Sequence, residues 1–191
     1  MEECNECSER LGEIQLILGP MFSGKTTELL RRYRRYQVVG RRCLLIKHGA
    51  DKRYSETKVS THCRQEADAI VLNKLDDFRE WACYDVICID EGQFFPDVTE
   101  ISEFLANNGK IVIVAALDGT WQRKPFENIA NLISASESIV KLTAVCMICK
   151  RDAPFTKRTC DDTALEVIGG ADKYMAVCRR CFHEPITSTK R

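Results

Sequence analysis

One eight-residue stretch, 19–26, limits the folds open to this chain more than any other feature. It fits the pattern G-x-x-x-x-G-K-[ST] in full, which is typical of loops that bind nucleotide phosphates. The loop consists of Gly19, Pro20, Met21, Phe22, Ser23, Gly24, Lys25 and Thr26. Its glycines allow backbone N–H groups to turn inward around an anion, and a following helix would present its positive end. We expect Lys25 to reach the β- and γ-phosphates and the Thr26 hydroxyl to ligate Mg²⁺.

The segments around this loop predict an α/β fold. Short apolar runs predict strands at 13–18, 43–47, 69–72, 86–90 and 111–117. Amphipathic segments between them predict helices after the phosphate loop, after Asn73 as a cap, and after Asp97. This alternation favours a parallel sheet covered on both faces, with ligands beyond the carboxyl ends of the strands. The loops expected at those ends begin at Gly19, His48, Glu91 and Asp118.

Two acidic residues end the fourth predicted strand. Phosphate-loop enzymes hold the Mg²⁺ shell with an Asp at such a strand end, which is the place of Asp90. Because side chains alternate along a strand, Glu91 is expected on the opposite face, where it can accept a proton from the attacking nucleophile. In an ATPase the same Glu would activate water. The two motifs therefore predict nucleotide use without identifying the acceptor.

Paired cysteines predict a second, smaller unit after about residue 143. Cys146-x-x-Cys149 and Cys178-x-x-Cys181 are separated by 28 residues and supply four thiolates, the ligand set of structural Zn²⁺. His183 is an alternative ligand. A third pair, Cys4-x-x-Cys7, lies in the polar N-terminal segment and is expected to be incidental or redox-exposed.

Composition excludes several classes of function. The 191 residues include 28 Lys+Arg and 28 Asp+Glu, which argues against a protein that coats nucleic acid. The longest apolar run, 111–117, is far shorter than the roughly 18 residues that span a bilayer. The N-terminal segment lacks the pattern of a secretory signal, and eleven cysteines without one favour a reducing, cytoplasmic location.

Aromatic residues gather in three segments that are candidates for a nucleobase site. These residues are Phe94, Phe95, Trp121, Phe126 and Tyr174. A base needs flat apolar walls with a few polar partners, but composition alone favours ordinary core packing for such residues. Six arginines between Arg31 and Arg42 are expected to form a solvated helix face that can pair with another subunit.

Taken together, these motifs make the chain similar to the zinc-containing cytosolic (type II) thymidine kinases. The resemblance rests on GPMFSGKT, DEGQFFPD, ALDGTWQRKPF, LTAVCMIC and VIGGADKY, which occur in this order and cover about residues 12–183. It implies ATP-dependent phosphorylation of the 5′-hydroxyl of thymidine or deoxyuridine in nucleotide salvage for DNA synthesis, by a RecA-like domain and a small zinc domain with a substrate-covering loop. It also implies feedback inhibition by dTTP and a homotetramer.

The resemblance assigns roles to individual residues. Catalytic roles fall to Glu91 as proton acceptor, Lys25 and Arg53. ATP and Mg²⁺ would be bound by the phosphate loop together with Asp51, Lys52, Arg53, Asp90, Glu91, Gly92 and Gln93. The nucleoside would contact Met21, Phe94, Leu117, Trp121, Phe126, Thr156, Leu165, Glu166, Val167, Ile168, Gly169 and Tyr174. Similar proteins usually carry Phe at the position of Trp121, so a narrower base site is expected here.

We therefore expect the chain to divide into a phosphate-loop domain at 12–142 and a zinc domain at 143–183. An N-terminal segment, 1–11, precedes them, and a tail, 184–191, follows them. One alternative is a nucleic-acid-dependent ATPase of RecA-like fold, which needs a basic groove that the balanced charge disfavours. Another is a structural or adaptor protein with a vestigial nucleotide site, which an intact set of Lys25, Thr26, Asp90 and Glu91 disfavours. No nucleic-acid or membrane partner is expected.

Overall fold

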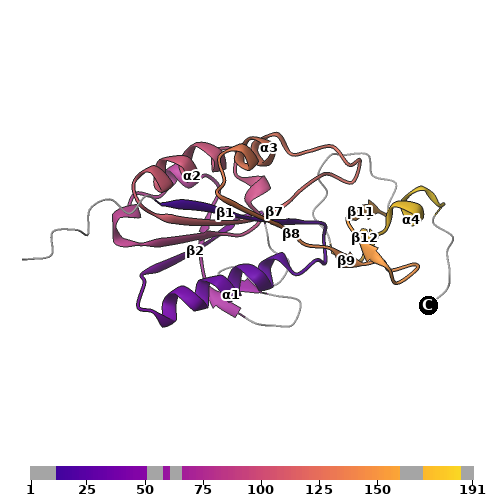
Figure 1. Ribbon diagram of the computed structural model, residues 1–191, viewed down its shortest axis with the longest axis horizontal. Helices are drawn as coiled ribbons and strands as arrows, with labels where there is room; N and C mark the ends of the chain where they lie inside the picture. The colour runs from indigo at the N-terminus through magenta and orange to yellow at the C-terminus, as the bar shows by residue number, and fades with distance from the viewer. Residues whose placement is uncertain (1–11, 51–57, 61–65, 160–169, 186–191) are drawn as a thin grey trace, which may run out of the picture.

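The computed structural model describes residues 12–50, 58–60, 66–159 and 170–185. Figure 1 shows two units side by side. The sheet unit runs from the first strand to β8, and the small unit runs from β9 to α4. Contacts described below connect them at the end of the sheet where the phosphate loop follows its strand.

The sheet unit is built on six strands, and every pairing within them is parallel. Their spatial order is β5-β2-β6-β7-β1-β8. The strands are β1 (Glu13–Gly19), β2 (Cys43–His48), β5 (Ile70–Leu72), β6 (Val86–Ile89), β7 (Ile111–Leu117) and β8 (Ser138–Lys141). The predicted α/β fold with a mainly parallel sheet is thus confirmed. One strand, β7, lies between β1, which leads into the phosphate loop, and β6, which leads into Asp90.

Alternation along the strands divides the core between the two faces of the sheet. Ile14, Leu16 and Leu18 of β1 pack into one fully buried cluster, whereas Ile17 packs into the cluster on the other face. The same period of two recurs in β6 and β7. Because both faces are covered, nearly every position of these strands is apolar, which explains why they read as continuous hydrophobic runs.

Helices cover the two faces unequally. On one face α1 (Lys25–Val38) packs through Leu29 and Leu30, while α2 (Val98–Asn107) and α3 (Glu127–Ser134) cover the other face. Figure 1 shows α2 and α3 above the sheet and α1 below it. Most charged residues of α1 lie off its apolar stripe, but Lys25, its first residue, is buried.

The small unit contains short antiparallel ladders and one short helix. These elements are β9 (Ala144–Val145), β10 (Asp152–Ala153), β11 (Phe155–Arg158), β12 (Tyr174–Val177) and α4 (Arg179–His183). Strand β9 pairs with β10, and β11 pairs with β12. Its buried residues include Cys146 and Cys181, so the predicted metal ligands belong to its core.

The prediction of a helix after Asn73 is wrong. The chain forms two short 3-10 turns there, η1 (Leu75–Asp77) and η2 (Trp81–Cys83), with Phe78 extended between them. The carboxylate of Asp97 accepts hydrogen bonds from the N–H groups of Leu75 and Asp76, at 3.3 and 2.9 Å. These long-range bonds hold the start of the segment, and Phe78 packs edge-on against Trp81. Tertiary contacts therefore override the helical spacing of the apolar residues.

Several elements were not anticipated from the sequence. Helix α3 and strand β8 complete the sheet unit, and the hairpin of β3 (Lys58–Ser60) and β4 (Glu66–Asp68) precedes β5. Another short turn, η3 (Gly92–Phe94), follows the acidic strand end. Helix α2, in contrast, begins after Asp97 as predicted.

Candidate active site

The predicted phosphate loop lies between β1 and α1, as its pattern requires. Gly24 has φ 83° immediately before the helix, and Phe22 has φ 66°, so left-handed residues alternate with others along the loop. Such alternation curls backbone N–H groups into an anion-binding nest. A side chain at Gly19, with φ 154°, would place its Cβ 2.7 Å from the carbonyl oxygen of Leu142. The first N–H groups of α1 have no partners within the helix and point toward the same space.

Lys25 is the first residue of α1 and is only 8% exposed. Its Nζ donates a hydrogen bond to the carbonyl oxygen of Pro20, at 2.9 Å, so the ammonium group lies across the loop. A buried cation beside a concave row of N–H groups favours the binding of a polyanion.

Thr26 and Asp90 meet next to the loop. The Thr26 hydroxyl lies 3.2 and 3.1 Å from the two carboxylate oxygens of Asp90, which is 4% exposed. A hydroxyl and a carboxylate that lie this close at the start of a helix form the oxygen-rich ligand set that Mg²⁺ prefers. The donors present therefore fit the expected metal ion.

Glu91 is placed by a left-handed turn, not by strand alternation as we expected. Strand β6 ends at Ile89, and Glu91 has φ 54° and ψ 45° before η3. Its side chain is 8% exposed and accepts a hydrogen bond of 2.6 Å from Gln93 Nε2. A non-glycine residue in this region of φ and ψ is uncommon and persists only when the surroundings hold it there.

The turn that carries Glu91 is fixed from two sides. Gln93 Oε1 accepts a hydrogen bond of 3.0 Å from the N–H of Leu117 at the end of β7. Asn128, in α3, donates its side-chain N–H to the carbonyl oxygens of Gln93 and Phe95 at 3.1 and 2.9 Å. These bonds pin η3 to two elements of the sheet unit, so the acidic pair has a rigid support.

The aromatic candidates divide between core and site. Phe95 is completely buried, so ordinary packing accounts for it, and the partly buried Phe126 packs against the same hydrophobic cluster. Phe94 is half-buried and lies 5.6 Å from the ring of His48, between the ends of β2 and β6.

Trp121 and Tyr174 come from different units, and both rings lie close to one guanidinium. The Cζ atom of Arg158 is 4.7 Å from the centre of the Trp121 ring and 5.4 Å from that of Tyr174. Arg158 was not among the predicted site residues. The indole Nε1 of Trp121 is buried without an acceptor among the residues that the structure describes.

Thr156 connects the small unit directly to the phosphate loop. Its hydroxyl oxygen accepts a hydrogen bond of 2.9 Å from the backbone N–H of Met21, and Thr156 and Met21 are both buried. One N–H group of the loop is thereby satisfied by a residue 135 positions later in the chain. Met21 and Thr156, both predicted nucleoside contacts, are thus neighbours.

Some predicted site residues lie outside the described residues. They are Asp51, Lys52, Arg53, Leu165, Glu166, Val167, Ile168 and Gly169. Cys4 and Cys7 also lie outside them.

The four cysteines predicted as metal ligands come together. All four sulfur atoms lie within 4.8 Å of one another, and Cys149 Sγ is 3.5 Å from Cys178 Sγ. Four thiolates around Zn²⁺ at about 2.3 Å would lie about 3.8 Å apart in a tetrahedron, so this arrangement fits the ion. Among the described residues this is the one group of cysteine, histidine and acidic side chains placed to bind a metal. His183 instead has its Nε2 3.5 Å from Arg123 Nη1.

The pKa values of these thiols reflect their crowding. Burial opposes ionisation of Cys146, but backbone N–H groups of Cys149, Cys178 and Ile148 outweigh it and lower the pKa of its thiol to about 6. Burial and the neighbouring sulfur atoms raise the pKa of Cys181 to about 12. Four thiolates therefore require a cation to balance their charge.

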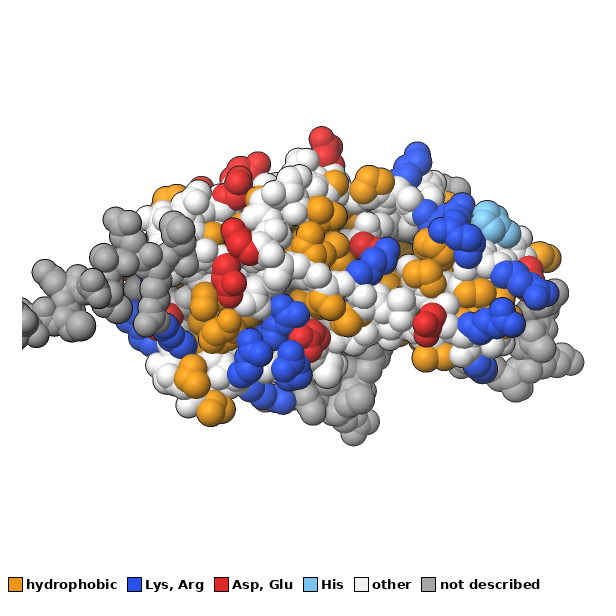
Figure 2. Space-filling model, in the orientation of Figure 1, with side chains coloured by type: hydrophobic (Ala, Val, Ile, Leu, Met, Phe, Trp, Pro, Cys, Tyr) orange, Lys and Arg blue, Asp and Glu red, His pale blue; other side chains and the backbone are white. Residues whose placement is uncertain are grey.

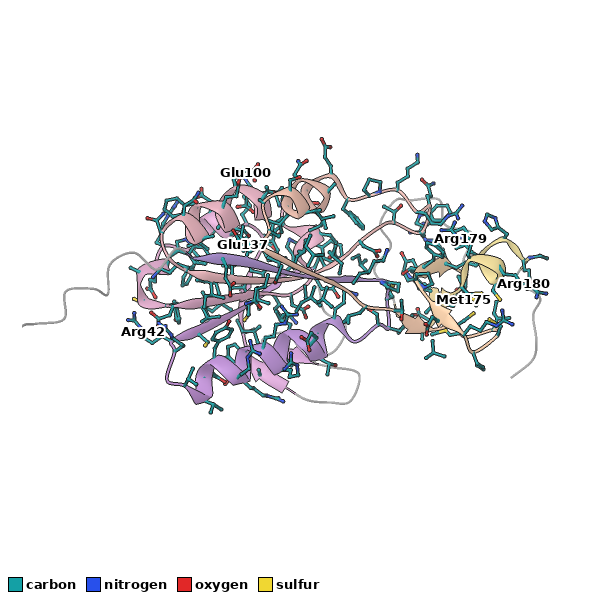
Figure 3. The ribbon with its side chains drawn as sticks, in the orientation of Figure 1. Arg42, Glu100, Glu137, Met175, Arg179 and Arg180 are labelled. Atoms are coloured by element: carbon teal, nitrogen blue, oxygen red, sulfur yellow. The ribbon has the colours of Figure 1, made fainter. Side chains whose placement is uncertain are left out.

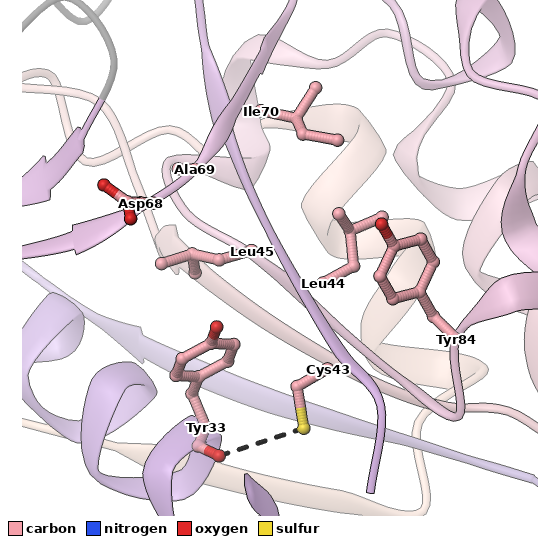
Figure 4. Close-up of a pocket in the computed structure, with 8 residues that line it drawn as sticks. All are labelled: Tyr33, Cys43, Leu44, Leu45, Asp68, Ala69, Ile70 and Tyr84. Atoms are coloured by element: carbon pink, nitrogen blue, oxygen red, sulfur yellow. Dashed lines mark hydrogen bonds between the residues drawn. The ribbon is translucent and has the colours of Figure 1, made fainter.

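A separate cavity of about 270 Å³ lies at the other end of β2 and contains none of the predicted site residues (Figure 4). Tyr33, Cys43 and Tyr84 contribute to its lining. Burial raises the pKa of the Cys43 thiol to about 11, and burial, with Cys43, raises the pKa of Tyr33. Both groups are neutral near pH 7, so the cavity offers no ionised nucleophile or base from them.

Basic side chains gather in two places on the face shown in Figure 2: over α1 and over the small unit. On α1, Glu28 forms ion pairs of 2.6 and 2.8 Å with Arg31 and Arg32. On the small unit, Arg179 and Arg180 project from α4 (Figure 3). In the part of the chain that the structure describes, no helix is long and apolar enough to cross a membrane.

Comparison with known proteins gives a consistent result. The family model described as thymidine kinase matches residues 12–182. Thymidine kinase of Vaccinia virus (strain Western Reserve) is 57% identical over 172 residues, which cover 90% of this chain and 97% of the relative. Thymidine kinase 1 of Dictyostelium discoideum is 54% identical over 177 residues, covering 90% of this chain and 78% of the relative. Thymidine kinase of Variola virus is 56% identical over 172 residues, covering 90% and 97%.

Proposed function

The chain belongs to the thymidine kinase family, and from this premise we propose that it transfers the γ-phosphoryl group of ATP to the 5′-hydroxyl of thymidine. The observation that carries the proposal is the meeting of a complete phosphate loop, a metal-binding pair and a buried carboxylate at one end of the sheet. Deoxyuridine, which lacks only a methyl group, is the expected second substrate.

Each polar residue of this site has a distinct proposed role. The phosphate loop and Lys25 bind the β- and γ-phosphates and stabilise the charge on the transferring group. Thr26 and Asp90 hold Mg²⁺, which when bound neutralises phosphate charge and orients the oxygens. Arg53 is proposed to add a positive contact, with Asp51 and Lys52 beside it. Gly92 and Gln93 support the turn next to the triphosphate.

Glu91 is proposed as the general base. Its carboxylate is buried and oriented by Gln93 Nε2, so a 5′-hydroxyl bound next to it can donate its proton there as the oxygen attacks phosphorus. Rigid support from Gln93 and Asn128 favours this role, because a base contributes most when it is held in position.

The nucleoside is proposed to bind between the two units. The Met21–Thr156 hydrogen bond and the contacts of Arg158 with Trp121 and Tyr174, which join the two units there, support this proposal. Phe94 and Leu117 are proposed to contribute from the sheet unit. We propose that residues 165–169 complete the site and that the small unit, held by Zn²⁺ on its four cysteines, excludes water that would otherwise accept the phosphoryl group. Phe126, which is partly buried beside the core, is proposed as a further contact.

The decisive experiment compares phosphate acceptors. The protein is incubated with ATP and Mg²⁺, and ADP release is measured without addition, with thymidine, with other nucleosides and with single-stranded DNA. Formation of thymidine monophosphate in equal amount to ADP supports the proposal. ADP release that depends on DNA, or that is the same with and without thymidine, would refute it.

Regulation and assembly are further parts of this proposal. We propose dTTP as a feedback inhibitor, a homotetramer as the assembly, and no nucleic-acid partner. Exposed apolar residues such as Val38 and Val39, 87% and 70% exposed at the end of α1, support self-association. None of the seven cysteines that the structure describes forms a disulfide, which supports the proposal of a reducing compartment such as the cytoplasm.

A further inference from the structure

Arg158 is a charged residue in an unusually buried place. It ends strand β11, is 6% exposed, and lies directly opposite Tyr174 in the ladder with β12. Charged side chains are seldom buried to this extent unless they are paired or hydrogen-bonded. Its position therefore points to a function that needs the guanidinium group.

The guanidinium makes two kinds of contact at once. Its Nη2 donates a hydrogen bond of 2.9 Å to the Tyr174 hydroxyl, and its Cζ atom lies 5.4 Å from the same ring. The same Cζ atom is 4.7 Å from the centre of the Trp121 ring. Trp offers the strongest face for a cation, and a planar guanidinium can stack and donate at the same time.

The two rings belong to different parts of the molecule. Trp121 lies in the loop between β7 and α3 of the sheet unit, whereas Tyr174 and Arg158 belong to the small unit. The side chains of Thr156 and Arg158, two residues apart on β11, lie on the same face of that strand. Thr156 accepts from the phosphate loop, so this one face contacts both ends of the proposed site.

We propose that Arg158 is a positioning residue that fixes the aromatic wall of the nucleoside site by holding Trp121 and Tyr174 with one guanidinium group. The inference rests on the proposed function, because it assigns Arg158 an effect on nucleoside binding. A point charge cannot replace the group, since a compact ammonium cannot stack on the indole ring while it donates to the phenol.

Kinetics of conservative variants test the proposal. Arg158→Lys keeps the charge but loses the planar fork, and Tyr174→Phe removes only the phenol hydroxyl. We expect Arg158→Lys to raise KM for thymidine about tenfold, the scale of a lost buried cation–π contact, while KM for ATP changes less than twofold. Tyr174→Phe should raise KM for thymidine by a smaller factor, and the double variant should be no worse than Arg158→Lys.

Arg123→Lys is the matched control. Arg123 also stacks on aromatic residues of the small unit, but it is exposed and its ring contacts are Phe182, at 4.5 Å, and Phe155, at 5.7 Å. The Arg123→Lys variant should keep KM for thymidine within twofold of the wild type. The proposal would be overturned if KM for thymidine rose equally in Arg158→Lys and Arg123→Lys. It would also be overturned if Arg158→Lys folded and kept the wild-type KM for thymidine. If Arg158→Lys does not fold, Tyr174→Phe alone decides, since unchanged KM in that variant also overturns it.

Tryptophan fluorescence separates this inference from the proposed function. In a Trp81→Phe background, Trp121 is the one remaining tryptophan. Without any substrate, Arg158→Lys should shift its emission, whereas Arg123→Lys should not. If wild-type protein fails to phosphorylate thymidine, the proposed function fails. If Arg158→Lys leaves the emission of Trp121 unchanged in the Trp81→Phe background, the positioning role fails, whatever the activity.

Discussion

At the residue scale, the conformation of Glu91 decides how the acidic pair is divided. Asp90 continues the line of β6 and reaches Thr26, while the left-handed turn at Glu91 sends the next carboxylate elsewhere. Two adjacent carboxylates can therefore serve the metal and the acceptor separately. The strain of a left-handed glutamate, of order 1–3 kcal/mol, is offset by the hydrogen bonds that fix η3.

Glu91→Gln tests the role of the base. It keeps the size and hydrogen bonding of the side chain but cannot accept a proton, so we expect kcat to fall about 10²–10⁴-fold. Binding of ATP and thymidine, measured by calorimetry, should stay close to wild type. Asp90→Asn should instead shift the dependence on Mg²⁺. Near-native single-turnover phosphorylation by Glu91→Gln would leave positioning alone to account for the rate.

Sequence reasoning reached some of these residues and missed others for identifiable reasons. The phosphate loop and the acidic strand end were predictable because short, contiguous motifs define them. Arg158 was not, because its partners Trp121 and Tyr174 lie 37 and 16 positions away and meet it only in the folded chain. The direction of Glu91 was also missed, since alternation applies only while the chain remains a strand.

At the scale of elements, the cysteine cluster gives the small unit its centre. Its ladders are two to four residues long, too short to stabilise a fold alone, so we expect metal-binding energy to be folding energy here. Cys149→Ser should lose the one Zn²⁺ per chain and lower the melting temperature. The control is Cys83→Ser, which changes an exposed thiol outside the cluster. This variant should keep the bound zinc and the melting temperature of the wild type. Metal analysis that finds full zinc in Cys149→Ser would contradict this ligand set.

The start of α1 supplies a pH-dependent contribution to stability. The hydrogen bond from Arg31 is the largest influence on the pKa of Glu28. Partial burial opposes it, and a hydrogen bond from Arg32 adds to it, so the pKa falls from 4.5 to about 2. Because the folded-state pKa is depressed, the stabilisation is present above pH 4.5 and is lost as the pH falls toward 2. After solvent screening we expect it to be about 1 kcal/mol.

Glu28→Gln should therefore lower the free energy of unfolding by about 1 kcal/mol at pH 7, with a difference that shrinks below pH 4.5. Urea titrations at pH 7, 5, 4 and 3 measure it. Glu100→Gln, in the first turn of α2 (Figure 3), is the control without the arginine pairs. A constant difference between Glu28→Gln and wild type across this range would show that the ion pairs contribute nothing.

Strands were more predictable than helices in this chain. Buried parallel strands appear as apolar runs, and each run that we identified is a strand. Strand β8 was missed because Ser138–Lys141 is short and mostly exposed, and its place beside β1 depends on pairing with a distant segment. The false helix after Asn73 had the correct apolar spacing, but the Asp97 carboxylate imposed another geometry.

At the scale of the whole molecule, the two units are joined by contacts on one side of the site. The Met21–Thr156 hydrogen bond and the Trp121–Arg158 stack tie the phosphate loop and the nucleoside wall to the same strand, β11. We therefore expect both units to take part in binding either substrate. Light scattering tests the proposed assembly: we expect about four times the chain mass of 21.8 kDa. A single-chain mass at micromolar concentration would refute the tetramer.

The position of β1 in the sheet also has a consequence for synthesis of the chain. Among the described residues, β1 pairs with β7 and β8. The earlier of these partners, β7, begins at Ile111, long after β1 ends at Gly19. At a ribosomal speed of roughly 5–20 residues per second, the fully apolar core face of β1 waits on the order of 5–20 s for its partners. The nascent chain therefore exposes an apolar segment during this time, and the phosphate loop that follows it reaches its final hydrogen bonding only after Thr156 has been made.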